Sequence, residues 1–375
     1  MSAAPDTSLL AKRACHVLVV VPCLNEAANL ATLVKGLRKD RNAHLHHIVL
    51  VDGGSTDGSQ AIIAQWVAEA ELEQGTLSSI NNPQVIQSAA VNLAVKQFGA
   101  GCEFLVRVDA HARYPLDYVS DLVDLALAQS PAPASLVVPM HSVARSTNWF
   151  AKACACAQNS LIGTGGAAHR LLDRAGPAAL REVDHGHHAL FRMDDFRALG
   201  GYDETFTHNE DAEYDTRLRA KGGTILLAGR LCIDYYPRAT ARALMRQYYQ
   251  FGRGRARHWL KHRNPLRLRQ MAPILVAPAL ILALLGSFVW ALFAAPAALW
   301  ALANLALAIV EDPPANGDPG RRLWRVERLA FIPAMLMQAA WSFGFWALCL
   351  RALTRMRDPT HARLQNRVDA VKLTR

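Results

Sequence analysis

The sequence predicts an α/β domain with a mostly parallel sheet, followed by a C-terminal helical membrane anchor. Two observations support this prediction. Short apolar runs rich in β-branched residues alternate with helical stretches in the first part of the chain, which is typical of a parallel sheet covered by helices. Residues 271–310 then contain no charged side chain, and a helix that spans a bilayer needs roughly 20 apolar residues.

The elements of the α/β domain follow one another in a regular order. Each apolar run is short enough for a strand, and the stretch after it is long enough for a helix. Because ligands bind outside the carboxyl ends of the strands in an open α/β sheet, the residues that follow each strand are candidates for a binding site. We expect strands at residues 16–22, 47–51, 77–80, 103–108 and 136–140, and helices at about residues 25–37, 57–71, 83–98 and 115–129.

The 375 residues divide by composition into a folded domain and a membrane-associated remainder. An uncharged run of 40 residues is difficult to bury inside a water-soluble protein, which disfavours the alternative that this run forms core helices. The predicted parts are a globular domain at 1–236, a basic amphipathic interfacial segment at 237–270, a transmembrane region at 271–353 with helices at about 271–292, 294–310 and 329–350, and a basic tail at 354–375.

Basic residues are concentrated next to the apolar runs, and the net charge of the chain is +10. Residues 237–270 contain ten Lys or Arg and no acid, interleaved with aromatic residues, which is typical of an interfacial helix that attracts anionic headgroups. Nucleic-acid binding is the competing use of this composition, and the adjacent apolar run argues against it. Seven scattered cysteines, an odd number, indicate reduced thiols in a cytoplasmic domain.

The membrane topology stays open at the last apolar run. The N-terminus lacks the apolar core of a signal peptide, so we expect a multi-pass protein of the cell inner membrane with its globular domain in the cytoplasm. Three crossings would place the basic tail outside, although its cations and the four arginines of residues 311–328 favour the cytoplasm. Both preferences are satisfied if residues 329–350 re-enter the membrane without crossing it.

An acidic residue stands at the end of the second predicted strand, in the segment VDGGSTDGS at residues 51–59. Asp52 is well placed to accept hydrogen bonds from a base or a ribose, and Gly53 and Gly54 allow a tight turn and the close approach of a ligand. Asp57 is a candidate cap of the following helix. The alternative is a turn that only connects strand to helix.

The fourth predicted strand ends in RVDAH, residues 107–111. Asp109 and His111 offer an oxygen and a nitrogen at a spacing that allows both to bind one divalent cation, and Mn²⁺ accepts mixed oxygen and nitrogen ligands. The alternative is that His111 is an ordinary surface residue.

A cluster of acids opens a predicted helix in HNEDAEYDTRLRAKG, residues 208–222. Carboxylates in the first turn of a helix lie near the positive end of its dipole, which favours their ionised form. Such a carboxylate can remove a proton from a hydroxyl group within hydrogen-bond reach. The alternative is a solvated, charged helix face. The four acids are Glu210, Asp211, Glu213 and Asp215.

Together and in this order, these segments resemble family 2 glycosyltransferases of the GT-A fold, most of all the ExoA-type succinoglycan glucosyltransferases. The likeness covers about residues 16–260 and implies a Rossmann-like, mostly parallel catalytic domain. The matching segments are VVVPCLNE (19–26), VDGGSTDGS (51–59), VDAH (108–111) and HNEDAEYDTRLRAKG (208–222), supported by NPQVIQSAAVNLAV (82–95), GTGGA (163–167) and GRGRAR (252–257).

The resemblance implies roles for residues of these segments. The donor would be a glucose-like UDP-sugar, and Asp109 would bind the Mn²⁺ or Mg²⁺ that bridges its diphosphate, with His111 in place of the second acid of a D-x-D motif. Asp211, beside Glu210, would be the catalytic base that deprotonates the acceptor hydroxyl in an inverting transfer. The residues expected to bind the nucleotide sugar are Pro22, Asn25, Glu26, Asp52, Gly54, Asn92 and Asp109.

The expected acceptor is a polyprenyl-diphosphate-linked saccharide of exopolysaccharide biosynthesis, because a water-soluble acceptor needs no anchored enzyme. In the histidine-rich segment at 184–191, one ring either contacts the acceptor diphosphate or adds a metal ligand; a polar loop beside the acceptor cleft is the alternative. The candidate acceptor contacts are Gly165, Gly166, His187, His188, Arg253, Arg257 and Trp259.

Three rival functions can be compared with this one. A processive polysaccharide synthase is disfavoured because its Q-x-x-R-W motif is matched only out of frame, by QFGRGRARHW at 250–259. A dinucleotide-dependent oxidoreductase lacks the required G-x-G-x-x-G after the first strand. A non-catalytic, membrane-associated nucleotide-binding protein is the remaining alternative, and the acids Asp109 and Asp211 argue against it.

Overall fold

The computed structural model describes residues 16–72, 76–165, 170, 180–263, 268–310 and 329–356. The chain divides into two compact units. The first consists of Met1–Arg145 and Gln158–Pro237, and the second of Ser146–Ala157 and Arg238–Arg375. The β-sheets belong to the first unit and the apolar C-terminal helices to the second.

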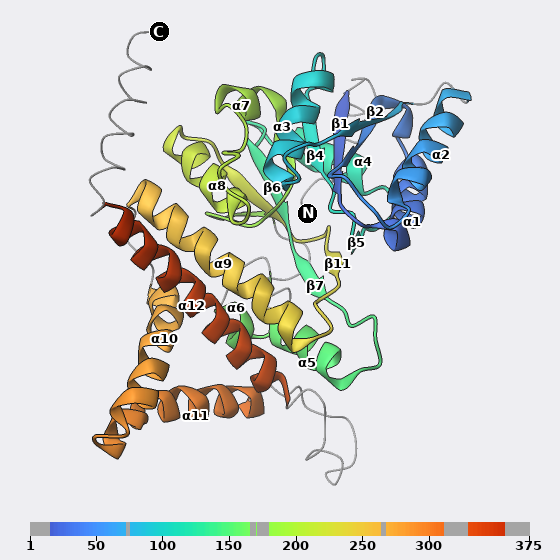
Figure 1. Cartoon of the computed structure of the whole chain (residues 1–375). Helices are drawn as coiled ribbons and strands as arrows, with labels where there is room; N and C mark the ends of the chain where they lie inside the picture. The colour runs from blue at the N-terminus through green and yellow to red at the C-terminus, as the bar shows by residue number, and fades with distance from the viewer. Residues whose placement is uncertain are drawn as a thin grey trace, which may run out of the picture. The chain divides into compact units, whose positions relative to one another are not determined.

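The first unit is built on an eight-stranded sheet with the strand order β3-β2-β1-β4-β9-β6-β10-β8 (Figure 1). Strands β3, β2, β1 and β4 pair in parallel, and so do β6 and β10. β9 lies between β4 and β6, antiparallel to both, and β8 is antiparallel to β10. The bounds are β1 Val17–Cys23, β2 His46–Asp52, β3 Leu77–Asn81, β4 Phe104–Arg107, β6 Ser135–Val138, β8 Leu180–Glu182, β9 His187–Arg192 and β10 Ile225–Ala228.

A smaller sheet with the order β5-β11-β7 lies beside the chain that leaves β4. Strand β11 (Ile233–Tyr235) pairs antiparallel with β5 (Ala112–Arg113) and parallel with β7 (Met140–Ser142). Because β5 begins one residue after His111, this sheet fixes the end of the RVDAH segment.

The mostly parallel α/β fold predicted from the sequence is confirmed. β1, β2, β3, β4 and β6 lie where strands were expected, with ends shifted by at most two residues. β9 was not predicted, and it makes the sheet mixed in its second half. The helices of the first unit are α1 Ala27–Arg38, α2 Ser59–Leu72, α3 Gln87–Phe98, α4 Tyr118–Leu127, α6 Leu161–Thr164, α7 Met193–Ala198 and α8 Glu210–Ala220, with a 3-10 turn, η2, at Ala43–Leu45. Helix α5, Trp149–Asn159, lies mostly in the second unit.

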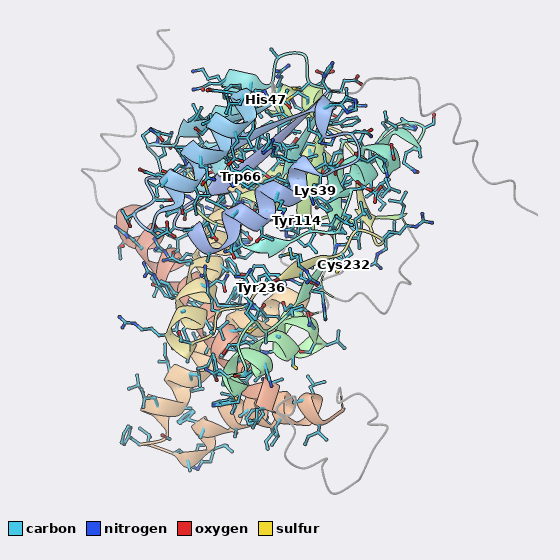
Figure 2. The ribbon with its side chains drawn as sticks, turned by 90° about the vertical axis from the view of Figure 1, so that its right-hand side faces the viewer. Lys39, His47, Trp66, Tyr114, Cys232 and Tyr236 are labelled. Carbon is cyan, nitrogen blue, oxygen red and sulfur yellow. The ribbon has the colours of Figure 1, made fainter. Side chains whose placement is uncertain are left out.

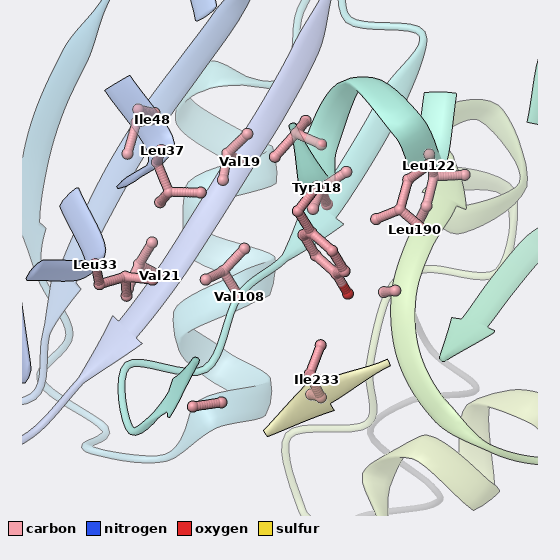
Figure 3. Close-up of a cluster of buried hydrophobic side chains, with 14 of the residues drawn as sticks. Val19, Val21, Leu33, Leu37, Ile48, Val108, Tyr118, Leu122, Leu190 and Ile233 are labelled. Carbon is pink, nitrogen blue, oxygen red and sulfur yellow. The ribbon is translucent and has the colours of Figure 1, made fainter. Parts of the chain in front are cut away.

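Apolar side chains cover both faces of the large sheet. On one face, Val19 and Val21 pack with Leu37 of α1 and Tyr118 of α4 (Figure 3). On the other face, side chains such as Val20 pack with residues of α3, α7 and α8. A sheet buried on both sides needs continuous apolar strands, which explains the run VLVVV in β1 and the run IVLV in β2.

The second unit contains four long helices: α9 Ala241–His262, α10 Leu268–Gly286, α11 Ala295–Val310 and α12 Phe331–Met356, with a 3-10 turn, η5, at Ala291–Ala294. By length and composition alone, two stretches could cross a membrane, Ala291–Ile309 and Phe331–Thr354, and they fit a membrane anchor. The first span was expected at residues 271–292. The apolar part of α10 is shorter, Met271–Gly286, since the helix ends at Gly286. Large apolar side chains around its end, such as Phe288 and Trp290, are exposed.

Two prolines lie inside α10, and α12 compensates for one of them. Pro278 has no N–H to donate to the carbonyl of Ile274, four residues earlier. That carbonyl instead accepts hydrogen bonds from Ser342 Oγ at 2.9 Å and Trp346 Nε1 at 2.8 Å. Such replacement of a lost backbone partner is how apolar helices tolerate proline inside a membrane.

Helices α9 and α12 cross at a point where only glycine fits. A Cβ added at Gly252 would lie 1.9 Å from the carbonyl oxygen of Trp341, and one added at Gly344 would lie 2.0 Å from that of Tyr249. Both atoms belong to helix backbones, so a small shift of one side chain does not relieve the clash. The GRGRAR segment therefore contributes packing as well as charge.

We expect Gly252→Ala to destabilise the second unit by about 1–3 kcal/mol, the usual effect of overpacking a tight contact. Thermal unfolding of the detergent-solubilised protein measures this change. Gly36→Ala is the matched control, because Gly36 lies in α1 with no atom within 4 Å of an added Cβ. The account of the crossing is wrong if both variants unfold like the parent protein.

Candidate active site

Two loops at the carboxyl edge of the sheet are joined by hydrogen bonds. Loop A (residues 23–27) ends β1, in which Pro22 pairs with Val51, and loop B (residues 52–59) ends β2. Backbone amides of each loop donate to side chains of the other, so the two loops form one rigid edge. These bonds are Asn25 N to Ser55 Oγ (2.8 Å), Glu26 N to Ser59 Oγ (2.8 Å), Ala27 N to Asp57 Oδ2 (3.0 Å) and Thr56 N to Asn25 Oδ1 (2.8 Å).

Asp52 organises loop B. Its side chain is buried and accepts hydrogen bonds from Gly54 N at 3.1 Å, Ser55 Oγ at 2.5 Å and Gln60 Nε2 at 2.9 Å. Burial acts to raise the pKa of Asp52, but these hydrogen bonds outweigh it and the pKa is lowered. Gly54 has φ of +88°, which is why glycine is needed there. In this arrangement the Asp52 carboxylate accepts hydrogen bonds from its own turn and so stabilises the shape of loop B. The sequence did not indicate this structural role.

Asn92, expected at the nucleotide sugar, instead holds a turn that faces the acids. Its Oδ1 accepts the backbone N–H of Tyr202 at 2.9 Å, and its Nδ2 donates to the carbonyl of Tyr202 at 2.8 Å. A Cβ at Gly201 would lie 2.4 Å from Asn92 Oδ1, so this contact requires glycine at position 201. Asn92 thereby holds the backbone at Tyr202.

Asp109 lies at the same edge of the sheet as Asp52, because β2, β1 and β4 are parallel neighbours. Its backbone N–H donates to the hydroxyl oxygen of Tyr114 (labelled in Figure 2) at 2.7 Å, and its Oδ1 accepts from Gln87 Nε2 at 2.7 Å. Its Oδ2 is 3.6 Å from the ring of His187. Burial acts to raise the pKa of Asp109, but the neighbouring Arg107 lowers it, so the carboxyl is ionised.

His111, two residues after Asp109, points its Nδ1 at Glu26 of loop A. Its Nδ1 is 3.2 Å from Oε1 of Glu26, whose other oxygen accepts from Asn29 Nδ2 at 2.6 Å. The His111 side chain is 41% exposed, so a ligand can reach it. Asn25 has φ of +57° and turns the backbone of loop A.

Arg107 connects the acids of the site, and sequence reasoning missed it. Its guanidinium is buried and donates to Asp211 through Nη1 at 2.6 Å and Nη2 at 3.3 Å. Its Nη1 lies 3.6 Å from Glu210 Oε1, and its Nε lies 3.5 Å from Asp109 Oδ1. The end of β4 and the start of α8 therefore meet at one cation. A charged residue inside the apolar strand FLVR was the available signal.

Glu210 and Asp211 occupy the first turn of α8, where the helix dipole favours negative charge. Their environments shift the pKa values of the two carboxyls in opposite directions. Burial and the neighbouring Asp211 raise the pKa of Glu210 to about 7. Burial acts to raise the pKa of Asp211 as well, but Arg107 and His188 hold it well below its ordinary value. Asp211 is therefore ionised across the physiological pH range, whereas Glu210 can carry a proton near neutrality.

The candidate acceptor residues are spread over the two units. His187 is buried, and burial lowers its pKa to about 4. His188 is fully buried with both ring nitrogens hydrogen-bonded to protein, so it differs from the expectation of a direct acceptor contact. Gly165 ends α6 and donates its N–H to the carbonyl of Leu161 at 2.9 Å. Gly166 lies outside the described residues, and Arg253, Arg257 and Trp259 belong to α9 of the second unit.

The sequence and the fold have known relatives. A family model described as glycosyl transferase family 2 matches residues 18–200. The succinoglycan biosynthesis protein ExoA of Rhizobium meliloti (strain 1021) is 43% identical over 329 residues, which are 88% of this chain and 93% of that protein. The mannosyltransferase PcManGT of Pyrobaculum calidifontis, solved in complex with GDP-Man and Mn²⁺, shares the fold with a TM-score of 0.52 and 19% identity, over 88% of this chain and 87% of that one.

The chain belongs to glycosyltransferase family 2. Asp109 and Asp211 are the ionised carboxyls that Arg107 brings together in this chain. The family resemblance seen in the sequence is confirmed, as is the GT-A fold.

The residues of this glycosyltransferase site can accommodate a divalent cation. Three acids surround Arg107, and burial together with the neighbouring Asp211 raises the pKa of one of them, Glu210. Among the described residues, no group of three His, Cys, Asp or Glu side chains forms a dedicated metal cage. Mg²⁺ and similar ions are often bound by only one or two protein groups together with water and substrate phosphates. The oxygen of Asp109 and a ring nitrogen of His111 suit such a site.

We expect Asp52→Asn to destabilise the first unit by about 1.5–3 kcal/mol at pH 7, the range for hydrogen bonds to a charged group. Because the pKa of Asp52 is lowered by folding, its contribution is present above the ordinary value of 3.8 and is lost as the pH falls further. The stability difference between parent and variant should therefore narrow below about pH 4.

Thermal unfolding from pH 3 to pH 8 measures this effect. Glu71→Gln, at an exposed position of α2, is the control and should follow the parent protein. An equal stability of the Asp52→Asn variant at pH 7 would refute the structural role of this carboxylate.

Proposed function

We propose that this protein is a membrane-anchored inverting glycosyltransferase of exopolysaccharide biosynthesis. It transfers one glucose-like sugar from a UDP-sugar to a polyprenyl-diphosphate-linked acceptor. The observation that carries the proposal is the ionised Asp211 at the start of α8, connected through Arg107 to Asp109 at the end of β4. One carboxylate is thus available to a hydroxyl and the other to a donor diphosphate.

In the proposed reaction, Asp211 takes the proton of the acceptor hydroxyl. The acceptor oxygen forms a bond to the anomeric carbon from the face opposite the diphosphate, and the bond from that carbon to the phosphate oxygen breaks. UDP leaves with the electron pair, and the configuration inverts. A bound Mn²⁺ or Mg²⁺, held by Asp109 and His111, would neutralise charge on the leaving diphosphate.

Loops A and B are proposed to bind the nucleotide. Their mutual hydrogen bonds fix the backbone before a ligand arrives, and Gly54 allows a close approach. Glu26 faces His111 at 3.2 Å, which brings the proposed nucleotide loop next to the proposed metal ligand. Asp52 acts in this proposal through the shape of loop B.

The lipid-linked acceptor and the pathway are supported by the relative and by the second unit. The ExoA protein, 43% identical, is named for succinoglycan biosynthesis. The two apolar helices that could cross a membrane would keep the catalytic domain at the inner membrane, where a lipid-linked acceptor resides. The basic helix α9 carries cations that complement a diphosphate headgroup.

We expect Asp211→Asn to lower the transfer rate by about 10²–10⁴-fold, the usual contribution of a general base. UDP-sugar binding should stay within a few-fold of the parent protein, because the donor loops are unchanged. Transfer to a lipid-linked acceptor and donor titration by calorimetry measure the two quantities. Asp194→Asn, exposed in the first turn of α7, is the matched control. Undiminished transfer by the Asp211 variant would eliminate it as the base.

We expect donor hydrolysis to be highest with a UDP-sugar and to require a divalent cation. A panel of UDP- and GDP-sugars, each assayed with Mn²⁺, with Mg²⁺ and with a chelator, identifies the donor. Asp109→Asn should weaken donor binding in the presence of Mn²⁺ far more than in its absence. Full activity in the chelator would contradict the metal assignment, and a GDP-sugar preference would contradict the nucleotide assignment.

A further inference from the structure

A fully buried histidine lies behind the proposed base. His188 of β9 is enclosed by aromatic rings, with centroid distances of 4.6 Å to Phe191, 5.6 Å to Tyr214 and 6.0 Å to Tyr202. An imidazole in such a place must find hydrogen-bond partners for both nitrogens, because unpaired buried polar atoms are costly.

Both ring nitrogens of His188 meet carboxylates of α8. Nε2 is 2.6 Å from Asp215 Oδ1. Nδ1 is 2.9 Å from the Tyr202 hydroxyl and 3.2 Å from Asp211 Oδ1. Residues 211 and 215 are one helical turn apart on the same face of α8, so one ring bridges both. The second oxygen of Asp215 is 2.8 Å from Nδ1 of His185, whose side chain is 25% exposed.

The two oxygens of Asp211 are used unequally. Oδ1 receives Arg107 Nη1 at 2.6 Å, the hydroxyl of Tyr202 at 3.2 Å and the His188 ring at 3.2 Å. Within the described part of the chain, the recorded partner of Oδ2 is Arg107 Nη2, at the longer distance of 3.3 Å. The carboxylate is thus held by one oxygen, and the other is the better placed to accept a proton from an acceptor hydroxyl.

The surroundings of His188 favour its charged form. Burial lowers the pKa of His188, but Asp215 and Asp211 outweigh this and raise it to about 9. The groups that face the ring are Asp211, Tyr214 and Asp215 of α8, the Tyr202 hydroxyl and Phe191 of β9, with Arg107 of β4 on the other side of Asp211. A doubly protonated ring donates through Nε2 to Asp215 and through Nδ1 to the Tyr202 hydroxyl, and its positive charge lies 3.2 Å from Asp211, so both acids have a cation beside them.

We propose that His188, supported by Asp215 and His185, is a positioning residue that fixes the orientation and the ionised state of the base Asp211. The inference rests on the proposed function, because it gives Asp211 the role of base. His188 does not touch the substrate in this role. It acts as a fixed cation that keeps one oxygen of the base occupied and the other available.

The test uses the full-length protein in detergent or nanodiscs with two isosteric variants, His188→Gln and Asp215→Asn. For His188→Gln we expect kcat to fall by about 10–100-fold with the donor KM within about threefold, since a misplaced catalytic group lowers turnover by such factors. The acid limb of its kcat profile should move to higher pH, because a cation that lowers the pKa of Asp211 is lost. For Asp215→Asn, the alkaline limb should move to lower pH, because His188 loses a carboxylate that keeps it charged.

Controls separate this role from a purely structural one. His44→Gln, at an exposed position, should leave kcat and both limbs unchanged. Adding His188→Gln to Asp211→Asn should lower kcat little further, because residues that act as a unit have non-additive effects. If Asp211→Asn abolishes transfer while folded His188→Gln keeps the parent kcat and acid limb, the inference is overturned and the proposed function stands.

If Asp211→Asn retains transfer, the proposed base and this inference fall together. If neither isosteric variant folds, nitrogen NMR of the parent protein labelled at histidine decides the question. A His188 ring protonated on both nitrogens at pH 7 and titrating near pH 9 supports the inference. A neutral ring at pH 7 overturns it.

Discussion

One buried guanidinium determines the arrangement of the acids in this glycosyltransferase. Arg107 is 3% exposed and lies within 3.6 Å of Asp109, Glu210 and Asp211. Carboxylates at such distances repel one another in a low-dielectric interior, and a shared cation is what allows them to stay together. Because Arg107 is a residue of β4 and its nearest partner, Asp211, lies in the first turn of α8, the same interaction also joins the sheet to the helix that carries the proposed base.

The charges around Arg107 do not balance within the protein. Arg107 and the raised-pKa ring of His188 are two cations, against the acids Asp109, Glu210, Asp211 and Asp215. Burial and, after it, the neighbouring Asp211 raise the pKa of Glu210 to about 7, so this carboxyl can carry a proton near neutrality. The nucleotide diphosphate of the proposed donor would bring further negative charge, which is consistent with the proposed divalent cation. The electrostatics thus favour metal-assisted binding.

The sequence predicted the parallel half of the sheet and the positions of Asp109 and Asp211, because both acids follow strong local patterns. Antiparallel β9 was missed, since its partners β4 and β6 are distant in the chain and its run HHALFR starts with two polar residues. Arg107 was missed because its importance depends on what its side chain reaches. Asp52 and Asn92 were expected to bind the nucleotide sugar, but pattern alone does not reveal that Asp52 accepts hydrogen bonds from its own turn or that Asn92 bonds to the distant backbone of Tyr202.

The reciprocal hydrogen bonds between loop A and loop B have a consequence for engineering. Asn25 accepts from Thr56 while its own amide donates to Ser55, so neither segment has a complete set of partners without the other. Suppose loop B alone were grafted from another transferase to change the donor preference. Backbone amides of loop A that donate to side chains of loop B would then lose their partners. The two segments constitute one exchangeable module, and they must be transplanted as a pair.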